Sequence, residues 1–174
     1  MAAMQWDRTL ADQMVESAVT FCAGKTFTGD TERTRQALRH GQCDACEYLR
    51  YSLAKQVGNY LGQMDRTVKA VYLFEAEPGE IDGATAQQRS GSRGISLIAW
   101  VDRKTAALSA LAAALEAGLL DSRRTIIDCA NATPACYFLD VHLVDDAEVR
   151  ERRGYGALVN GLHVRPLQVW TRTS

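Results

Sequence analysis

The sequence predicts an α/β (α+β) fold, in which a small mixed β-sheet is flanked by helices and preceded by a segment of three helices. Apolar residues in the first 64 positions recur every three or four residues, the spacing of amphipathic helices. From Val68 onward they recur with the period of a strand. Strand-like and helix-like stretches then follow in the order β-loop-β-α-(β)-β-α-β, which is typical of a mixed sheet with packed helices. We therefore expect a helical segment at residues 1–64 and an α/β core at residues 65–174, packed as one unit.

Three helices are expected in the N-terminal segment. The first spans residues 5–23, with apolar positions at Leu10, Met14, Val15, Ala18 and Val19. The second follows Thr28 or Asp30, either of which can cap a helix by accepting a hydrogen bond from a free backbone N–H. The third spans residues 43–64, and its apolar residues recur every four positions, at Ala45, Leu49, Leu53, Val57 and Leu61.

The strands of the core are recognised by their apolar runs. The stretch "VKAVYLF" at residues 68–74 is apolar on both faces and is expected in the centre of the sheet. The stretch at residues 163–172 is expected at an edge, because Pro166 cannot donate a ladder hydrogen bond. The remaining strands are expected at residues 94–101 and 135–146, with a short one within 123–131.

The connections of the core include two helices and one long loop. Residues 102–121 are rich in alanine and leucine and predict a helix. A second helix is expected to begin at Asp145 and Asp146, where negative charge suits the N-terminal end of the helix dipole. Residues 77–94 contain Pro78 and four glycines and predict a loop, which is long enough to suggest a function.

Composition narrows the classes of function. The chain has 174 residues and a net charge of −1, so it has no overall attraction to nucleic acid or to an anionic membrane. It has no run of about 18 apolar residues, which a membrane-spanning helix would need. Its five cysteines are an odd number, which favours the reducing cytoplasm over a secreted disulfide framework. Trp100 and Trp170 are expected in the core or in a homodimer contact.

The order of elements resembles the core of the small nucleotidyltransferases of the polymerase-β-like superfamily. The resemblance is carried by "VKAVYLF", "ISLIAWVD", "YFLDVHLVDDAEVRERRGYGALVNG" and "LHVRPLQVW", and it covers about residues 45–170. In that family the first strand leads into a Gly-Ser turn, the second carries an Asp-x-Asp pair, and a third supplies another acid. The resemblance implies a fold that holds Mg²⁺ between carboxylates and a nucleoside triphosphate against the turn.

This sequence departs from the family pattern at most of these positions. Glu75 and Ala76 stand in place of the Gly-Ser turn, Ser96 and Ile98 stand in place of the acid pair, and Asp140 alone matches, as the third acid. We therefore predict a non-catalytic, nucleotidyltransferase-like binding or regulatory protein of unknown ligand, which acts with a second copy of the chain or another protein partner.

Two alternatives remain open at this point. In the first, the chain is a divergent metal-dependent phosphotransfer enzyme with candidate catalytic residues Glu75, Asp140 and His142. Its Mg²⁺ ligands would be Glu75, Glu77, Asp140 and Asp102, and its phosphate-binding residues Arg89, Ser92 and Arg93. The simpler interpretation of Asp140 and His142 is that they share a strand face that meets solvent or a helix cap.

In the second alternative, the chain is a zinc-stabilised helical adaptor. His40, Cys43 and Cys46 have the spacing of half a zinc site, and Cys22 could supply a fourth ligand. A second cysteine pair, which a strong zinc signature contains, is missing from the sequence. The simpler interpretation is that the cysteines pack as small apolar residues at a helix start.

Overall fold

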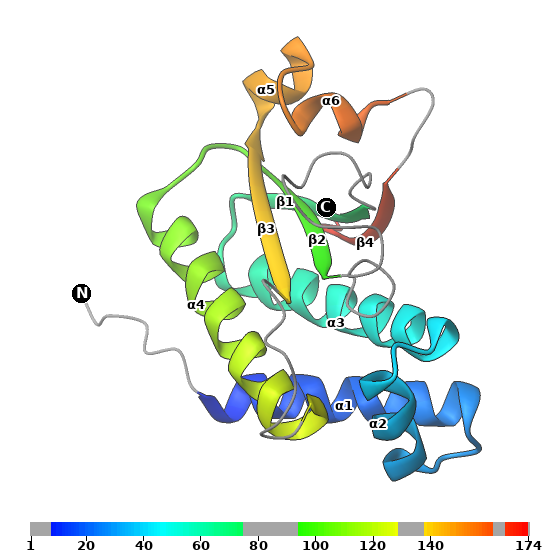
Figure 1. The fold of residues 1–174 in the computed structure, drawn as a ribbon. Helices are drawn as coiled ribbons and strands as arrows, with labels where there is room; N and C mark the ends of the chain where they lie inside the picture. Colours follow the sequence, from blue (N-terminus) through cyan, green and yellow to red (C-terminus); the bar gives the residue numbers. More distant parts are fainter. Residues whose placement is uncertain (1–7, 75–93, 129–137, 162–165, 174) are drawn as a thin grey trace, which may run out of the picture.

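The computed structural model describes residues 8–74, 94–128, 138–161 and 166–173. In this part of the chain a four-stranded mixed sheet packs with helices, and three helices precede the first strand (Figure 1). The predicted fold class is confirmed. None of the helices in the described ranges is both long enough and apolar enough to cross a membrane.

The three N-terminal helices lie close to their predicted places. They are α1 (Arg8–Thr26), α2 (Thr31–Arg39) and α3 (Cys43–Met64). The first runs three residues past its predicted end, and the chain leaves it through Thr28 and Gly29, whose φ angles are 52° and 92°. Asp30 rather than Thr28 caps α2, because its Oδ1 accepts a hydrogen bond from the Arg33 N–H at 3.0 Å.

The sheet has the strand order β3-β2-β1-β4, which places β1 and β2 in the centre. The strands are β1 (Val68–Phe74), β2 (Ile95–Val101), β3 (Leu139–Asp145) and β4 (Leu167–Thr171). The first strand pairs antiparallel with both of its neighbours. The strands β2 and β3 pair parallel, and the chain between them contains helix α4 (Ala106–Arg123). The predictions of a central first strand and a last strand at an edge are both confirmed.

The prediction of a short strand within residues 123–131 is wrong for residues 123–128, which the structure describes. A π-helix, η1 (Arg124–Asp128), continues α4 instead. The N–H of Arg124 donates to the carbonyls of Leu120 and Asp121, so the helical hydrogen bonding does not stop at the end of α4. Ile127 is buried in the core, and its carbonyl accepts a hydrogen bond from Arg39 Nε on α2. The apolar residues that predicted a strand therefore lie in a helical turn, which a hydrogen bond from α2 stabilises.

The two faces of the sheet are covered by different helices. Figure 1 shows α3 below the strands, α4 alongside β3, and α1 at the bottom, where it contacts both helices. Alternate side chains such as Val71 and Leu97 join the main core on this side. On the other face Ile98 and Val144 pack with Val149 of α5 (Asp146–Glu151) and with residues of α6 (Gly156–Val159).

A solvent-exposed ion cluster links α5 to the sheet. Lys69 lies where the pairing of β1 with β2 shifts, and its Nζ is 2.8 Å from Asp102 Oδ1 and 2.7 Å from Asp146 Oδ2. Trp100 Nε1 donates to the other oxygen of Asp146 at 2.7 Å. Asp145 is the N-cap of α5 and forms a reciprocal capping box, so the prediction that the Asp145–Asp146 pair starts a helix is confirmed.

Trp170 of β4 packs against α3 where two glycines stand one turn apart. A Cβ placed on Gly62 would lie 2.1 Å from Trp170 Cζ2, and one placed on Gly58 would lie 3.0 Å from Trp170 Cβ. Arg172 reinforces the contact, because its guanidinium donates to the carbonyls of Gly62 and Val68. Trp170 therefore belongs to the fold of this chain, where it packs against the main core.

We predict that Gly62→Ala lowers the free energy of unfolding by about 1–3 kcal/mol, since the new methyl group overlaps the Trp170 ring and forces a side chain or the helix to move. The measurement is urea unfolding followed by circular dichroism. Gly24→Ala is the matched control, because it also replaces a helical glycine but its Cβ would meet no atom within 4 Å. Alanine there should leave stability unchanged or raise it by up to about 1 kcal/mol. Equal effects of the two substitutions would contradict the prediction.

Candidate functional site

The register of the sheet brings the strand residues of the predicted site together. Ser96 pairs with Phe74 on one side and with Asp140 on the other. Ile98, two residues further along β2, pairs with His142. Since side chains two residues apart on a strand share a face, Asp140 and His142 point to the same side of the sheet, as predicted.

His142 is the centre of a compact group that we call the His142 cluster: Phe74, Asp140, His142 and Tyr155. The imidazole Nε2 is 3.1 Å from Asp140 Oδ2. Its ring stacks on Tyr155 with the centroids 3.7 Å apart and the planes 19° apart. The Phe74 ring lies against both, at centroid distances of 5.7 Å and 5.5 Å. Tyr155 comes from the turn between α5 and α6, so the end of the sheet and this turn build the cluster jointly.

The surroundings of His142 favour its neutral form. Burial lowers the pKa of the imidazole below its usual value, and the Asp140 carboxylate opposes this shift without cancelling it. About a fifth of the side chain is exposed. A neutral imidazole that donates Nε2–H to Asp140 leaves Nδ1 as an acceptor, so the pair can bind or accept a proton.

The described residues place no second metal-binding carboxylate of the predicted phosphotransfer site beside Asp140. Ser96 is 4% exposed and Ile98 is fully buried, so two residues without a carboxylate occupy the places of the acid pair. Asp102 lies past the opposite end of β2, more than five residues from Ser96, which is at least about 17 Å along the strand. It is engaged there with Lys69. Asp102 and Asp140 therefore cannot hold the same metal ion.

The remaining residues of the predicted phosphotransfer site lie outside the described residues. These are Glu75, Glu77, Arg89, Ser92 and Arg93. Their roles as catalytic, Mg²⁺-binding or phosphate-binding residues stay predictions.

The candidate zinc ligands surround the α2–α3 connection. His40 is the C-cap of α2, Cys43 is the first residue of α3 and is exposed, and Cys46 is one turn further along. Cys22 of α1 is buried, and its Sγ is 3.3 Å from the carbonyl oxygen of Ala45. Burial raises the pKa of the Cys46 thiol, which disfavours the thiolate. Across the described ranges no three His, Cys, Asp or Glu side chains are grouped so as to hold a metal ion.

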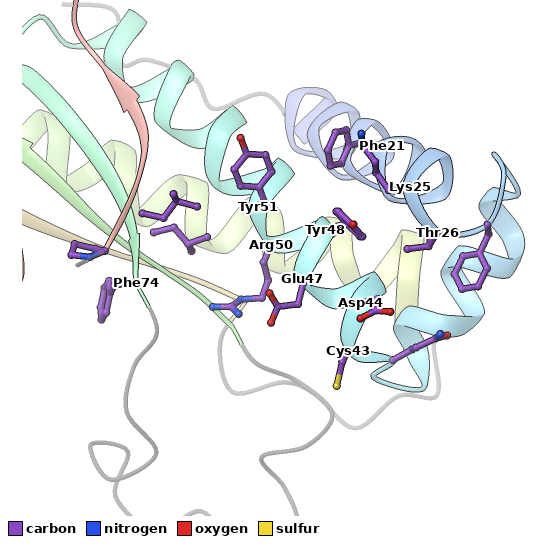
Figure 2. A pocket seen from close by; sticks show the side chains of 15 residues that line it. Phe21, Lys25, Thr26, Cys43, Asp44, Glu47, Tyr48, Arg50, Tyr51 and Phe74 are labelled. Carbon is purple, nitrogen blue, oxygen red and sulfur yellow. The ribbon is translucent and has the colours of Figure 1, made fainter. Parts of the chain in front are cut away.

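A groove lined with aromatic side chains lies between the N-terminal helices and the ends of β1 and β4 (Figure 2). We call it the aromatic groove. Phe21 of α1 meets Tyr48 and Tyr51 of α3, with ring centroids 6.3 Å and 6.4 Å apart. The two tyrosines are 38% and 37% exposed. Phe74 and Leu167 continue the lining at the ends of the strands.

The aromatic groove also contains charged side chains. Lys25 lies 5.7 Å from the centroid of Phe21, in a cation–π contact. Figure 2 shows Asp44, Glu47 and Arg50 below the tyrosines on α3. Acidic and basic groups are thus both available beside an aromatic surface. The groove is open to solvent and has a volume of about 1290 Å³. Pockets for drug-sized ligands span roughly 300–1,000 Å³, so such a molecule fits in it.

Sequence reasoning overlooked the aromatic groove, although a signal for it exists. Tyr48 and Tyr51 are three residues apart and lie off the four-residue apolar stripe of α3. Neighbouring large aromatic residues off the buried stripe can form a contiguous apolar patch, and such a patch is typical of a binding surface. Phe21 could be paired with them only after α1 and α3 had been placed side by side.

Comparisons with known proteins add no family to these observations: no protein-family model, curated protein or solved structure matches this chain. What stands of the nucleotidyltransferase resemblance is the mixed α/β fold with its four-stranded sheet.

The lowered pKa of His142 predicts a loss of stability on mild acidification. The unfolded chain takes up a proton near pH 6.5, but the folded chain does so only at lower pH, so protons favour the unfolded state. The stability that His142 contributes is complete above about pH 7.5 and falls as the pH drops through 6.5 toward the folded pKa. Urea unfolding at pH 7.5 and 5.5 should therefore show a smaller pH-dependent loss in His142→Gln than in the unmodified chain. His40→Gln, at an exposed helix end, serves as the control and should retain the full loss. Identical losses in all three proteins would contradict the prediction.

Proposed function

We propose that this chain is a non-catalytic binding or regulatory protein that takes a small organic molecule with a planar ring into the aromatic groove. The supporting observation is the meeting of Phe21, Tyr48 and Tyr51, from two helices, beside a space large enough for such a ligand. Aromatic pairs contribute about 0.5–1.5 kcal/mol beyond the burial of their area. Two exposed tyrosine rings would gain most from a flat partner.

The non-catalytic part of the proposal draws on the sheet. Ser96 and Ile98 supply no carboxylate where the nucleotidyltransferase pattern has its acid pair. Asp140, the matching third acid, is already engaged with His142. A chain with that arrangement of elements but without that acid pair is suited to binding. No contact among the described residues favours the phosphotransfer or zinc-adaptor alternatives over this one.

The proposal predicts that 2-naphthol binds better than 2-decalol, its saturated and non-planar counterpart. Both probes are neutral and have the same carbon skeleton, so the comparison tests the preference for a flat aromatic ring over a saturated one. Each probe is titrated into the protein and followed by ¹H–¹⁵N correlation spectra. Binding should shift the amide signals of α3 around Tyr48 and Tyr51. The affinity for 2-naphthol should be about two- to tenfold higher than that for 2-decalol. Tyr48→Leu and Tyr51→Leu should each weaken 2-naphthol binding by a similar factor.

Tyr60→Leu is the matched control, because Tyr60 is another tyrosine of α3 but packs against the main core and does not line the aromatic groove. It should leave 2-naphthol binding unchanged. Equal affinities for the two probes, or shifts that spare α3, would overturn the binding site. Turnover of Mg²⁺–nucleoside triphosphate that disappears in Asp140→Asn would overturn the non-catalytic assignment.

A further inference from the structure

The outer edge of β3 borders a second groove, which we call the β3 edge groove. The strand pairs with β2 on one side only, and its other side faces no strand within the described part of the chain. The groove runs between this edge, helix α4 and the α5–α6 turn. It is open to solvent and has a volume of about 510 Å³. The residues of α4 that line it are small apart from one: Ser109, Ala112, Ala113 and Glu116. Small side chains leave room for another chain beside the strand.

Two glutamates bond to the outward backbone groups of β3. The N–H of Val141 donates to Glu116 Oε1 at 2.8 Å, and the N–H of Asp145 donates to Glu148 Oε2 at 3.0 Å. Because backbone groups two residues apart on a strand point the same way, the N–H of Leu143 faces this edge between them. Proteins cover open strand edges in this way to prevent unwanted pairing. Here the covering at Val141 is a side chain, which can rotate away.

The charge around the β3 edge groove is mostly negative. Glu116 of α4, Asp140 of β3 and Glu148 of α5 contribute carboxylates. Lys104 is the one lysine or arginine among the described lining residues, and His142 is also in the lining. Lys104 is paired with Glu148 at 2.7 Å. Burial raises the pKa of Glu116, and the nearby Asp140 carboxylate raises it further, while the bond from Val141 opposes both. A cation beside Glu116 and Asp140 would relieve this repulsion.

We propose that the β3 edge groove binds a basic, extended peptide segment of a partner protein, which adds to the sheet as a fifth strand beside β3. The peptide carbonyls accept the N–H groups of Val141 and Leu143, as in β-strand addition. Glu116 leaves Val141 and pairs with a lysine or arginine of the peptide. This partner is distinct from the planar ligand of the aromatic groove, so either proposal can fail without the other.

The test uses fluorescein-labelled decapeptides and fluorescence anisotropy with the full chain. A peptide of alternating lysine and threonine should bind at least about tenfold more tightly than one of alternating glutamate and threonine. The same lysine peptide with N-methyl groups on consecutive backbone nitrogens has both of its edges blocked. It should lose about tenfold in affinity, because it cannot form the strand ladder. Hydrogen exchange at the Leu143 amide should slow when the lysine peptide is bound.

Glu116→Gln keeps an acceptor for Val141 but removes the charge, and it should weaken the lysine peptide about three- to tenfold. Asp121→Asn is the matched control, since it removes a carboxylate from the same helix. Asp121 pairs with Arg124, away from the groove. It should bind the peptide as the unmodified chain does.

Several results would overturn the proposal. One is equal binding of the lysine and N-methylated peptides, which would indicate charge attraction without strand addition. Another is an unchanged exchange rate at Leu143, or no binding of the lysine peptide. Dimerisation of the free chain with protection of Leu143 would assign the edge to a second copy instead.

Discussion

The close approach of α3 to the sheet is the constraint on which the rest of this structure depends. Gly58 and Gly62 carry no side chain to keep Trp170 away, so β4 can lie against the helix while it pairs with β1. The guanidinium of Arg172 then bonds to carbonyls of both α3 and β1. The same helix carries Tyr48 and Tyr51 about two to four turns before these glycines. Its position against the sheet therefore also places one wall of the aromatic groove beside the strand ends.

The opposite face of the sheet combines a small apolar cluster with an exposed set of charged and hydrogen-bonded groups. Two short helices cover it, and neither is long enough to be stable by itself. Lys69 and Trp100 hold Asp146, and the capping box at Asp145 completes the start of α5. This anchoring positions the turn that carries Tyr155, which in turn encloses His142. The environment of the histidine is thus set by contacts at the far end of β3.

The two edges of the sheet have different surroundings. On the β4 side, α3 and the Trp170 contact build the fold itself. On the β3 side, the covering consists of individual carboxylates, Glu116 and Glu148, that accept single backbone N–H groups. The α3–Trp170 contact is part of the packed core, whereas a glutamate side chain can rotate without unfolding any element. That difference is why the inferred peptide site lies on β3.

The sequence alone determined the elements whose signals are local. Periodicity placed α3 and β1, Asp30 and Asp145 identified two helix starts, and Pro166 marked the edge strand, because each depends on backbone chemistry within a few residues. Local signals failed at η1, where Arg39 holds Ile127 in a helical turn from a distant part of the chain. The shared face of Asp140 and His142 followed from strand period, but the stacking of Tyr155 on His142 did not. The contact of Phe21 with Tyr48 and Tyr51 did not follow from local signals either. Only the tertiary structure decided these contacts, because they join residues whose separation in the sequence carries no information about their separation in space.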